Sequence, residues 1–225
     1  MKPRLFTTAD GSHSLHSDHF GAAYHSTHGA LNESVHIFIE AGLRPLLVDG
    51  PQSVEVLEMG LGTALNALLT WQVARQREDL TVHYTSFETH PVGAERAAEL
   101  NYPDLLDLPR EDFLLLHRLP FGATHRLSGN FFFTKRQEDF LSAPPQSTFH
   151  LIYYDAFAPE QQPELWTAEA MLRCRRWLRE GGRLVTYCAK GQFKRNLRSA
   201  GFAVEALPGP IGKREITRAN LVDLT

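Results

Sequence analysis

Short apolar runs alternate along this chain with longer stretches in which apolar residues recur at helical spacing. The clearest case is VEVLEMGLGTALN, residues 54–66, where an apolar run passes through Gly60 and Gly62 into a helix-like sequence that begins at Ala64. This order predicts a buried strand, a tight glycine turn and the first turn of a helix. Glycine lets a backbone approach a ligand closely, and the first helical turn presents unpaired N–H groups, so we expect a ligand site here.

The same alternation continues through the rest of the chain. Residues 80–88 and 149–154 have the character of buried strands, and a hairpin is expected over 124–136, turning at residues 128–130. Further helices are expected over 91–100, 167–182 and 193–202, and further strands over 183–190, 202–207 and 215–222. Strands that alternate with helices favour an α/β fold with a mostly parallel sheet.

The N-terminal part has a different pattern. RLFTTADGSHSLHS, residues 4–17, resembles a hairpin that turns at Asp10-Gly11. Residues 32–43 have helical apolar spacing, with Asn32 as a candidate N-cap. We therefore expect a hairpin and a helix ahead of the main α/β unit.

A chain of 225 residues fits one α/β domain with a decorated edge. We expect residues 1–50 to form an N-terminal extension packed on the core, and residues 51–225 to form a Rossmann-like domain. Residues 101–123 are rich in Pro and Leu without a clear period, which is typical of an insertion.

Composition excludes several classes of protein. No apolar run reaches ~18 residues, so no membrane span is expected, and the N-terminal sequence lacks the apolar centre of a secretory signal. Cys174 and Cys188 have no metal-type spacing and indicate reduced thiols in the cytoplasm. Six of the 11 histidines lie between His13 and His36, but none joins a carboxylate in a familiar ligand pattern, so no metal site is expected.

Charge is unevenly distributed, although the net charge is only -3. Residues 1–172 hold 11 basic and 22 acidic residues, whereas residues 173–225 hold 12 basic and 4 acidic residues. An acidic body with a basic C-terminal quarter can meet a polyanion on one face. The alternative is that the basic residues form only a solvated surface.

The glycine turn differs from two common nucleotide loops. Leu65 occupies the place of the third glycine of the dinucleotide fingerprint, and no Lys-Ser or Lys-Thr follows, which excludes a triphosphate loop. Glu58, at the strand end, would repel a pyrophosphate but suits a cationic ligand, such as the amino group of an adenosylmethionine tail.

Acidic residues also follow the other expected strands. Glu88 comes one βαβ unit after the glycine turn, where a carboxylate can accept both ribose hydroxyls of an adenosine ligand. Glu138 and Asp139 follow the hairpin over 124–136, and either can accept a hydrogen bond from an adenine amino group. Asp155 ends the next buried strand, and it faces the same crevice because open α/β sheets bind ligands at the carboxyl edge.

With these residues in view, the chain resembles the methyltransferase half of the bacterial bifunctional tRNA wobble-uridine enzyme and its stand-alone relatives. The matching blocks are AYHSTHGALNES, EMGLGTALN, SFETHP, DAFAPEQQPELW, LREGGRLVTYCAKGQFKRNLRSAGF and PGPIGKRE, spread over about nine tenths of the chain. The block DAFAPEQQPELW is the most specific of these. The family often has glycine where this chain has Ala64, a change expected to spare the helix start.

The resemblance implies a seven-stranded, Rossmann-like class I methyltransferase fold whose last strand is antiparallel. It also implies that S-adenosylmethionine is the cofactor, and it assigns by position the methionine end to Glu58, Gly60 and Gly62, the ribose to Glu88 and the adenine to Asp139 or Glu138. Asp155 is implied as the catalytic carboxylate.

The implied substrate is tRNA that carries 5-aminomethyl-(2-thio)uridine at wobble position 34, whose amine is methylated. We expect substrate contacts from residues near Asp155 and from the basic C-terminal quarter, namely Tyr24, Phe157, Pro159, Trp166, Lys190, Lys194, Arg195, Lys213 and Arg214. The expected partner is the anticodon stem-loop, and a separate oxidase is a further expected partner that supplies the aminomethyl group.

The chemistry also follows from the residues themselves. An alkyl ammonium, with a reference pKa of about 10.4, must lose a proton before its nitrogen attacks a sulfonium methyl, and the Asp155 carboxylate can accept the N–H and orient the nitrogen. Because the reference pKa of Asp is only about 3.9, orientation is expected to outweigh proton abstraction. Two other functions stay open: an aminopropyltransferase of the spermidine synthase type, and a non-catalytic RNA-binding module that retains the nucleoside pocket.

Overall fold

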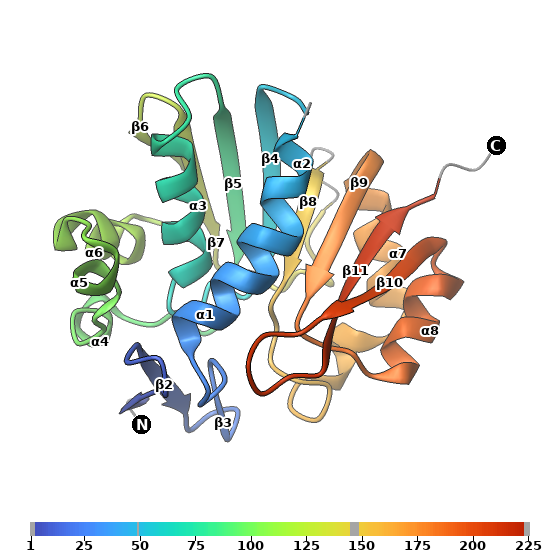
Figure 1. Cartoon of the computed structure of the whole chain (residues 1–225), viewed down its shortest axis with the longest axis horizontal. Coiled ribbons are helices and arrows are strands. Elements are labelled where there is room, and N and C mark those ends of the chain that lie inside the picture. The colour runs from blue at the N-terminus through green and yellow to red at the C-terminus, as the bar shows by residue number, and fades with distance from the viewer. Residues whose placement is uncertain (1–2, 49, 145–148, 223–225) are drawn as a thin grey trace.

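The computed structural model describes residues 3–48, 50–144 and 149–222. Its centre is an eight-stranded sheet with the order β10-β11-β9-β8-β4-β5-β7-β6 (Figure 1). The strands are β4 (Ser53–Met59), β5 (Thr81–Phe87), β6 (Thr124–Ser128), β7 (Phe131–Arg136), β8 (Phe149–Tyr154), β9 (Leu178–Thr186), β10 (Phe202–Pro208) and β11 (Glu215–Leu221).

Strand β4 pairs in parallel with β5 and β8, and the parallel pairing continues to β7 on one side and to β9 on the other. Strand β11 runs antiparallel to both β9 and β10. The predicted α/β class, the parallel core and the antiparallel last strand are therefore confirmed. The expected number of seven strands is one too low, because β6 folds back on β7 through the predicted hairpin and adds an eighth strand at the edge.

Alternate residues of β4 face opposite sides of the sheet and enter two apolar clusters. Val54 and Val56 belong to one cluster, and Leu57 and Met59 to the other. The first cluster is covered by α3 (Leu65–Arg75) and by a continuous helix made of α1 (Ala30–Ser34), the π-helical segment η1 (Val35–Leu43) and α2 (Arg44–Leu47). The second cluster is covered by α7 (Ala168–Trp177) and α8 (Gly191–Ser199), so helices lie on both faces of the sheet (Figure 1).

Gly42 lets the long N-terminal helix lie close to the sheet. A Cβ atom at this position would be 2.9 Å from Cγ2 of Val185 in β9 and 3.5 Å from Cε1 of Tyr153 in β8. Segment η1 also contacts β11 and α3. Residues 35–43 therefore cover the part of this face that α3 leaves open.

Helix α7 ends at Trp177, before the glycine pair that was expected to stop it. Those glycines lie inside β9, where the pairing with β8 shifts between Phe149↔Leu178 and Leu151↔Arg183. Gly181 has φ +70°, a conformation that suits such a bulge. The helix end predicted from the sequence is wrong because a glycine pair fits a β-bulge as well as a helix stop.

The predicted N-terminal hairpin is present as β1 (Arg4–Thr7) and β2 (His13–Ser17), with a short β3 (Ala22–Ala23) beside β2. Its turn caps the helix that follows. Ser12 Oγ accepts a hydrogen bond from Ala30 N at 3.1 Å, and Asp10 Oδ2 accepts one from Asn32 N at 2.9 Å. The expected cap from the Asn32 side chain is replaced by the hairpin, since Gly29 is the residue at the N-cap.

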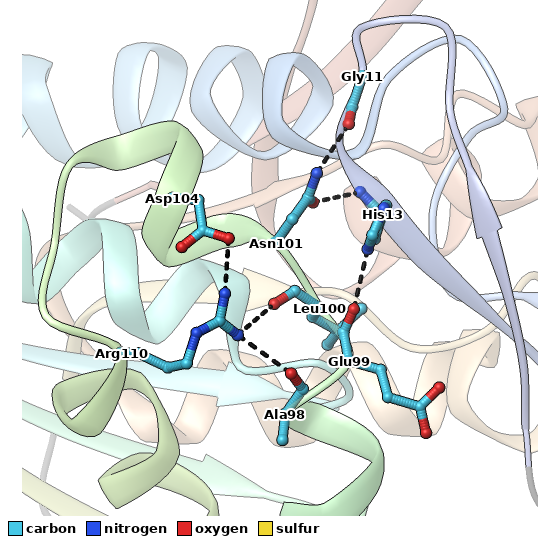
Figure 2. Close-up of polar contacts among 8 residues, drawn as sticks. All are labelled: Gly11, His13, Ala98, Glu99, Leu100, Asn101, Asp104 and Arg110. Carbon is cyan, nitrogen blue, oxygen red and sulfur yellow. Dashed lines mark hydrogen bonds and ion pairs between the residues drawn. The ribbon is translucent and has the colours of Figure 1, made fainter.

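The segment expected as an insertion carries two short helices, α5 (Tyr102–Leu106) and α6 (Arg110–Arg118), after the one-turn helix α4 (Ala94–Ala97). Figure 2 shows how it joins the N-terminal hairpin: Asn101 Nδ2 donates to Gly11 O at 2.9 Å, and Asn101 Oδ1 accepts from His13 N at 2.7 Å. Arg110 Nη2 donates to Asp104 Oδ2 at 2.6 Å. The insertion and the hairpin therefore support each other.

Candidate active site

A cavity of about 840 Å³ lies at the carboxyl ends of β4, β5 and β8. Its lining includes the glycine turn after β4, Glu88 after β5 and Asp155 after β8. Because these strands are parallel neighbours, their carboxyl ends meet at one edge, which is where open α/β sheets bind ligands. The structure thus gathers these three predicted elements around a single cavity.

The turn after β4 requires glycine at two places. Gly60 has φ +86°, and a Cβ atom there would be 2.9 Å from the carbonyl oxygen of Asp155. Gly62 has φ +51°, and a Cβ atom there would be 3.0 Å from Cδ1 of Tyr24. Gly60 N donates to Phe87 O at 2.9 Å. The turn is therefore held between the ends of β5 and β8, with its backbone at the cavity.

Ala64, at the N-cap of α3, has left-handed backbone angles of φ 60° and ψ 20°. An L residue with a side chain pays about 1–2 kcal/mol in this conformation, which glycine avoids. Helix α3 nevertheless begins at the next residue, Leu65, so the helix start is kept, as expected. The Ala64 methyl group is fully buried in the first apolar cluster, which offsets part of that cost.

Glu88 is held by two backbone N–H groups. Gly62 N donates to Oε2 at 2.9 Å, and His90 N donates to Oε1 at 2.7 Å. Each carboxylate oxygen has a further lone pair, so both can still accept hydrogen bonds from a ligand in the cavity. This geometry suits a pair of ribose hydroxyls.

Glu138 and Asp139 both line the cavity, but their surroundings differ. Glu138 forms an ion pair with Arg136. Asp139 is exposed, and its Oδ1 accepts a hydrogen bond from Leu141 N at 2.9 Å. Because the Glu138 carboxylate already has a guanidinium partner, Asp139 is the better candidate acceptor for a neutral amino group.

Glu58 does not line the cavity, contrary to the expectation from the sequence. It is completely buried on the β4 face that holds Val54 and Val56, and neither carboxyl oxygen makes a hydrogen bond with any residue that the structure describes. Burial, opposed by the polar side chains of Ser86, Asn66 and Tyr84 and reinforced by the nearby charge of Asp155, raises the pKa of Glu58 well above its ordinary value. Its surroundings therefore favour the protonated form, and the residue lies in the core because β4 continues there as far as Met59.

Asp155 follows β8, and one side-chain amide fixes its carboxylate. Asn66, in the first turn of α3, donates from Nδ2 to Asp155 Oδ2 at 2.8 Å. Burial and, to a smaller extent, the charge of Glu33 together raise the pKa of Asp155 to about 7, against the hydrogen bond from Asn66 and the charge of Lys213. An acid with this pKa can gain or lose a proton near neutral pH.

Glu33 was missed in the sequence. It belongs to α1, and it lines the cavity together with Lys213 from the β10–β11 loop. Lys213 Nζ lies 3.2 Å from Glu33 Oε1, and Ser26 N donates to Glu33 Oε2 at 2.8 Å. The only sequence signal for Glu33 was its place in the AYHSTHGALNES block, where no spacing marks one acidic residue as special.

Aromatic side chains form another part of the lining. Phe20 stacks on Phe157 with their ring centroids 4.3 Å apart, and the Tyr24 ring meets that of Phe157 edge-on at 5.0 Å. His19 stacks on His90 at 4.1 Å beside them. Burial raises the pKa of Tyr24 to about 12, so its hydroxyl stays protonated. These residues offer flat surfaces on which a planar base can stack.

Trp166 and Pro159, two expected substrate contacts, are not among the lining residues. Trp166 is 4% exposed and packs edge-on against Phe193 at 4.9 Å. Its Nε1 donates to Phe157 O at 2.8 Å. The indole therefore supports the Phe157 loop from the core side, because α8 covers the surface that the sequence suggested was free.

The expected phosphate contacts fall into two groups. Three lysines are paired with carboxylates: Lys190 with Glu160, Lys194 with Glu215 and Lys213 with Glu33. Arg195 and Arg214 are exposed, and Arg195 donates to Gln192, an uncharged side chain. The two arginines are thus the members of the set best placed to meet a polyanion.

Two further findings concern only the residues described. They contain no cluster of three or more His, Cys, Asp or Glu side chains placed to hold a metal ion. Nor do they include a helix with the length and apolar character needed to span a membrane.

Residues 135–222 match the family described as S-adenosyl-L-methionine-dependent methyltransferases. The chain is 31% identical over 213 residues to the tRNA 5-methylaminomethyl-2-thiouridine biosynthesis bifunctional protein MnmC of Cupriavidus necator, with 91% of this chain and 32% of that protein covered. The MnmC protein of Aromatoleum aromaticum is 32% identical over 232 residues, with 98% and 36% covered. The chain thus spans about a third of the length of these curated relatives.

Among solved structures, the crystal structure of MnmC2 from Aquifex aeolicus is similar to this chain with a TM-score of 0.81. The two are 24% identical, and the match covers 97% of this chain and 70% of that one. At this identity the likeness shows the fold. The predicted class I S-adenosylmethionine-dependent methyltransferase fold is confirmed.

Proposed function

Because this chain is a relative of the methyltransferase portion of the bacterial MnmC proteins, we propose that it methylates the amine of 5-aminomethyl-(2-thio)uridine at position 34 of tRNA. The product is 5-methylaminomethyl-(2-thio)uridine. The observation that carries the proposal is Asp155, an acid with a pKa of about 7 that lines the same cavity as Glu88.

The cavity fits S-adenosylmethionine, the methyl donor of the matched family. Glu88 presents two fixed carboxylate oxygens for the ribose, and Asp139 is the candidate acceptor for the adenine amino group. Gly60 and Gly62 bring backbone to the place assigned to the methionine end. When bound, S-adenosylmethionine supplies an electrophilic methyl group, whose bond to sulfur breaks as the bond to nitrogen forms.

Asp155 prepares the attacking amine. An alkyl ammonium with a reference pKa of about 10.4 donates an N–H to the carboxylate, transfers that proton and is left with a lone pair to direct at the methyl group. Asn66 donates to Oδ2 and uses one of its lone pairs, so Oδ1, which this amide leaves untouched, is the oxygen proposed to meet the amine. The reference pKa of Asp favoured orientation of the amine over proton abstraction. With a pKa of about 7, Asp155 is a stronger base, so proton abstraction contributes to catalysis together with orientation.

The aromatic lining suits the base that carries the amine. The stacked Phe20 and Phe157 rings and the edge of Tyr24 can flank a uracil ring once it has left the anticodon stack. Exposed Arg195 and Arg214 are proposed to contact phosphates of the anticodon stem-loop. We place the reaction in the cytoplasm, where buried free thiols such as Cys174 and Cys188 stay reduced, with the aminomethyl group supplied by an oxidase.

Methyl transfer from labelled S-adenosylmethionine to tRNA that lacks this methylation tests the proposal. The expected result is label in one wobble nucleoside, identified by mass spectrometry after digestion. Label transfer from decarboxylated S-adenosylmethionine to a polyamine would instead indicate an aminopropyltransferase. Tight tRNA binding without any transfer would indicate a non-catalytic RNA-binding module.

A further inference from the structure

The ion pair between Glu33 and Lys213 lies inside the cavity. The side chain of Glu33 is 10% exposed and that of Lys213 is 27% exposed. An ion pair on an open surface adds little to stability, but a pair that lines a cavity changes the charge that a ligand meets. The two residues come from α1 and from the β10–β11 loop, so the fold brings them to Asp155 from separate directions.

Lys213 is held toward the cavity by several contacts. Its Nζ lies 4.9 Å from the centroid of the Tyr187 ring, and Tyr187 Oη donates to Ala156 O at 2.8 Å, one residue after Asp155. Its backbone N donates to Pro210 O at 2.9 Å. The ammonium group is therefore engaged at the site and is poorly placed to reach a phosphate on the surface.

Glu33 and Lys213 shift the pKa of Asp155 in opposite directions. Burial makes the largest contribution to the raised pKa of Asp155, Glu33 adds to it and Lys213 opposes it. The other titratable groups that interact with Asp155 are buried and have raised pKa values, namely Glu58, Tyr84 and Tyr187. The two tyrosines stay uncharged near neutral pH and burial disfavours the charged form of Glu58, which leaves Asp155, Glu33 and Lys213 as the groups that set the charge at this end of the cavity.

We propose that Glu33 and Lys213 are positioning residues that set the charge of the acceptor end, defined as Asp155, Glu33 and Lys213, so that it accepts one alkylammonium group. Lys213 cancels the charge of Glu33, and the carboxylate of Asp155 supplies a single net negative charge. This rests on the proposed function, and it narrows the substrate class to a base that carries one amine. A polyamine, with two or more cationic groups, would meet too little negative charge.

The test uses four variants of the full chain and two ligands. Sinefungin has a primary amine in place of the sulfonium methyl of S-adenosylmethionine, whereas S-adenosylhomocysteine has neither group. The ratio of their affinities at pH 8 therefore reports the charge at the acceptor end without tRNA. Glu33→Gln removes a negative charge from the acceptor end and should lower the preference for sinefungin at least ~3-fold. Lys213→Met removes a positive charge and should raise that preference at least ~3-fold.

Two variants serve as controls. Lys213→Arg keeps the positive charge and should keep the parent affinity ratio. It therefore shows whether the effect of Lys213→Met comes from the lost charge or from a disturbed fold. Glu40→Gln removes an ion-paired glutamate from the same continuous helix, where Glu40 pairs with the exposed Arg44, and should also leave the ratio unchanged.

The pH dependence of single-turnover methyl transfer gives a second readout. The acidic limb should move to lower pH in Glu33→Gln and to higher pH in Lys213→Met, because the two charges act on Asp155 in opposite directions. The proposal that Glu33 and Lys213 set the charge of the acceptor end is overturned if the acidic limb stays in place in both variants and their affinity ratios remain within ~2-fold of the parent. A parent that methylates no tRNA while the ratios move as stated refutes the proposed function alone.

Discussion

Asn66 Nδ2 lies 2.8 Å from Asp155 Oδ2, and this hydrogen bond joins the first turn of α3 to the end of β8. The hydrogen bond thus connects α3, the helix that follows the glycine turn, to the carboxylate at the end of β8. The amide uses one lone pair of Oδ2 and therefore favours Oδ1 as the oxygen that meets a substrate amine. It also stabilises the charged form of an acid whose burial favours the neutral form.

Asp155→Asn keeps the shape of the side chain and removes its charge. Single-turnover methyl transfer should fall by about 10²-fold or more, the effect usual for a group that accepts a proton in the reaction. S-adenosylmethionine affinity, measured by calorimetry, should stay within ~3-fold of the parent. Asp79→Asn, at an exposed carboxylate that pairs with Arg77 on the surface, is the matched control, and a rate for Asp155→Asn close to that control would remove Asp155 from the mechanism.

The same residue predicts a pH dependence of stability. The pKa of Asp155 is about 7 in the folded chain against an ordinary value of 3.8, so the folded state keeps a proton that the unfolded state loses. Its contribution to the free energy of unfolding is fully present below pH 3.8 and is lost as pH rises through 7. Asparagine does not titrate. Relative to the parent, Asp155→Asn should therefore gain stability from pH 4 to pH 8.

Urea unfolding of the parent and the variant at several pH values measures this difference. A constant offset between the two curves across that range would show that the carboxyl group is not perturbed in the folded chain.

Much of this architecture was predictable because three neighbouring parallel strands are each followed by a residue suited to a ligand site. Apolar runs followed by Gly60, Glu88 and Asp155 placed three strand ends at one edge, and the parallel pairing of β5, β4 and β8 brings them together. The local pattern sufficed for the sheet because alternation and turn chemistry are short-range signals. It failed at Gly181, where the bulge depends on pairing between β8 and β9.

The parts of the site that could not be predicted depend on packing between distant segments. Glu33 reaches the cavity only because the helix over residues 30–47 lies across the sheet, which no local pattern shows. Glu58 and Trp166 have residue types suited to a ligand, yet neither lines the cavity. Whether a strand end or a loop reaches the surface is decided by what covers it, and that is a property of the whole fold.

Glu88→Ala should weaken S-adenosylmethionine binding. The carboxylate accepts from Gly62 N and His90 N and is assigned to the ribose hydroxyls, and charge-assisted hydrogen bonds contribute roughly 1.5–3 kcal/mol each. A loss of at least ~10-fold in affinity is expected by calorimetry. Glu88→Gln, which keeps the acceptor oxygen but loses the charge, should fall between the parent and alanine. Parent-like affinity in folded Glu88→Ala would exclude the assigned contact.

Gly60→Ala tests the close approach of the glycine turn to β8. Gly122 is a matched control, since its φ of +84° is nearly that of Gly60 at +86°, while a Cβ atom at Gly122 meets nothing within 4 Å. Both variants should lose about 1 kcal/mol or more from backbone strain. Gly60→Ala should lose more, because its Cβ would be 2.9 Å from Asp155 O. Equal losses in urea unfolding would show that the turn can move away from Asp155.

The basic C-terminal quarter yields a prediction that separates two neighbouring residues. Arg195 is exposed, whereas the side chain of Lys194 is 12% exposed and is paired with Glu215 at 2.6 Å. Each phosphate contact contributes about 0.9 to the log–log slope of tRNA affinity against salt. Arg195→Gln should therefore flatten that slope by ~0.9 and weaken tRNA binding, with S-adenosylmethionine affinity unchanged.

Lys194→Gln should leave the slope in place, because its ammonium already has a carboxylate partner on β11, and should instead lower the free energy of unfolding. Filter binding at four or more salt concentrations measures both slopes. If Arg195→Gln kept the parent slope while Lys194→Gln flattened it, the ion pair with Glu215 would have to open when tRNA binds. If neither variant changed the slope, α8 would present only a solvated surface, and the phosphate contacts would have to come from other residues, with Arg214 the next to test.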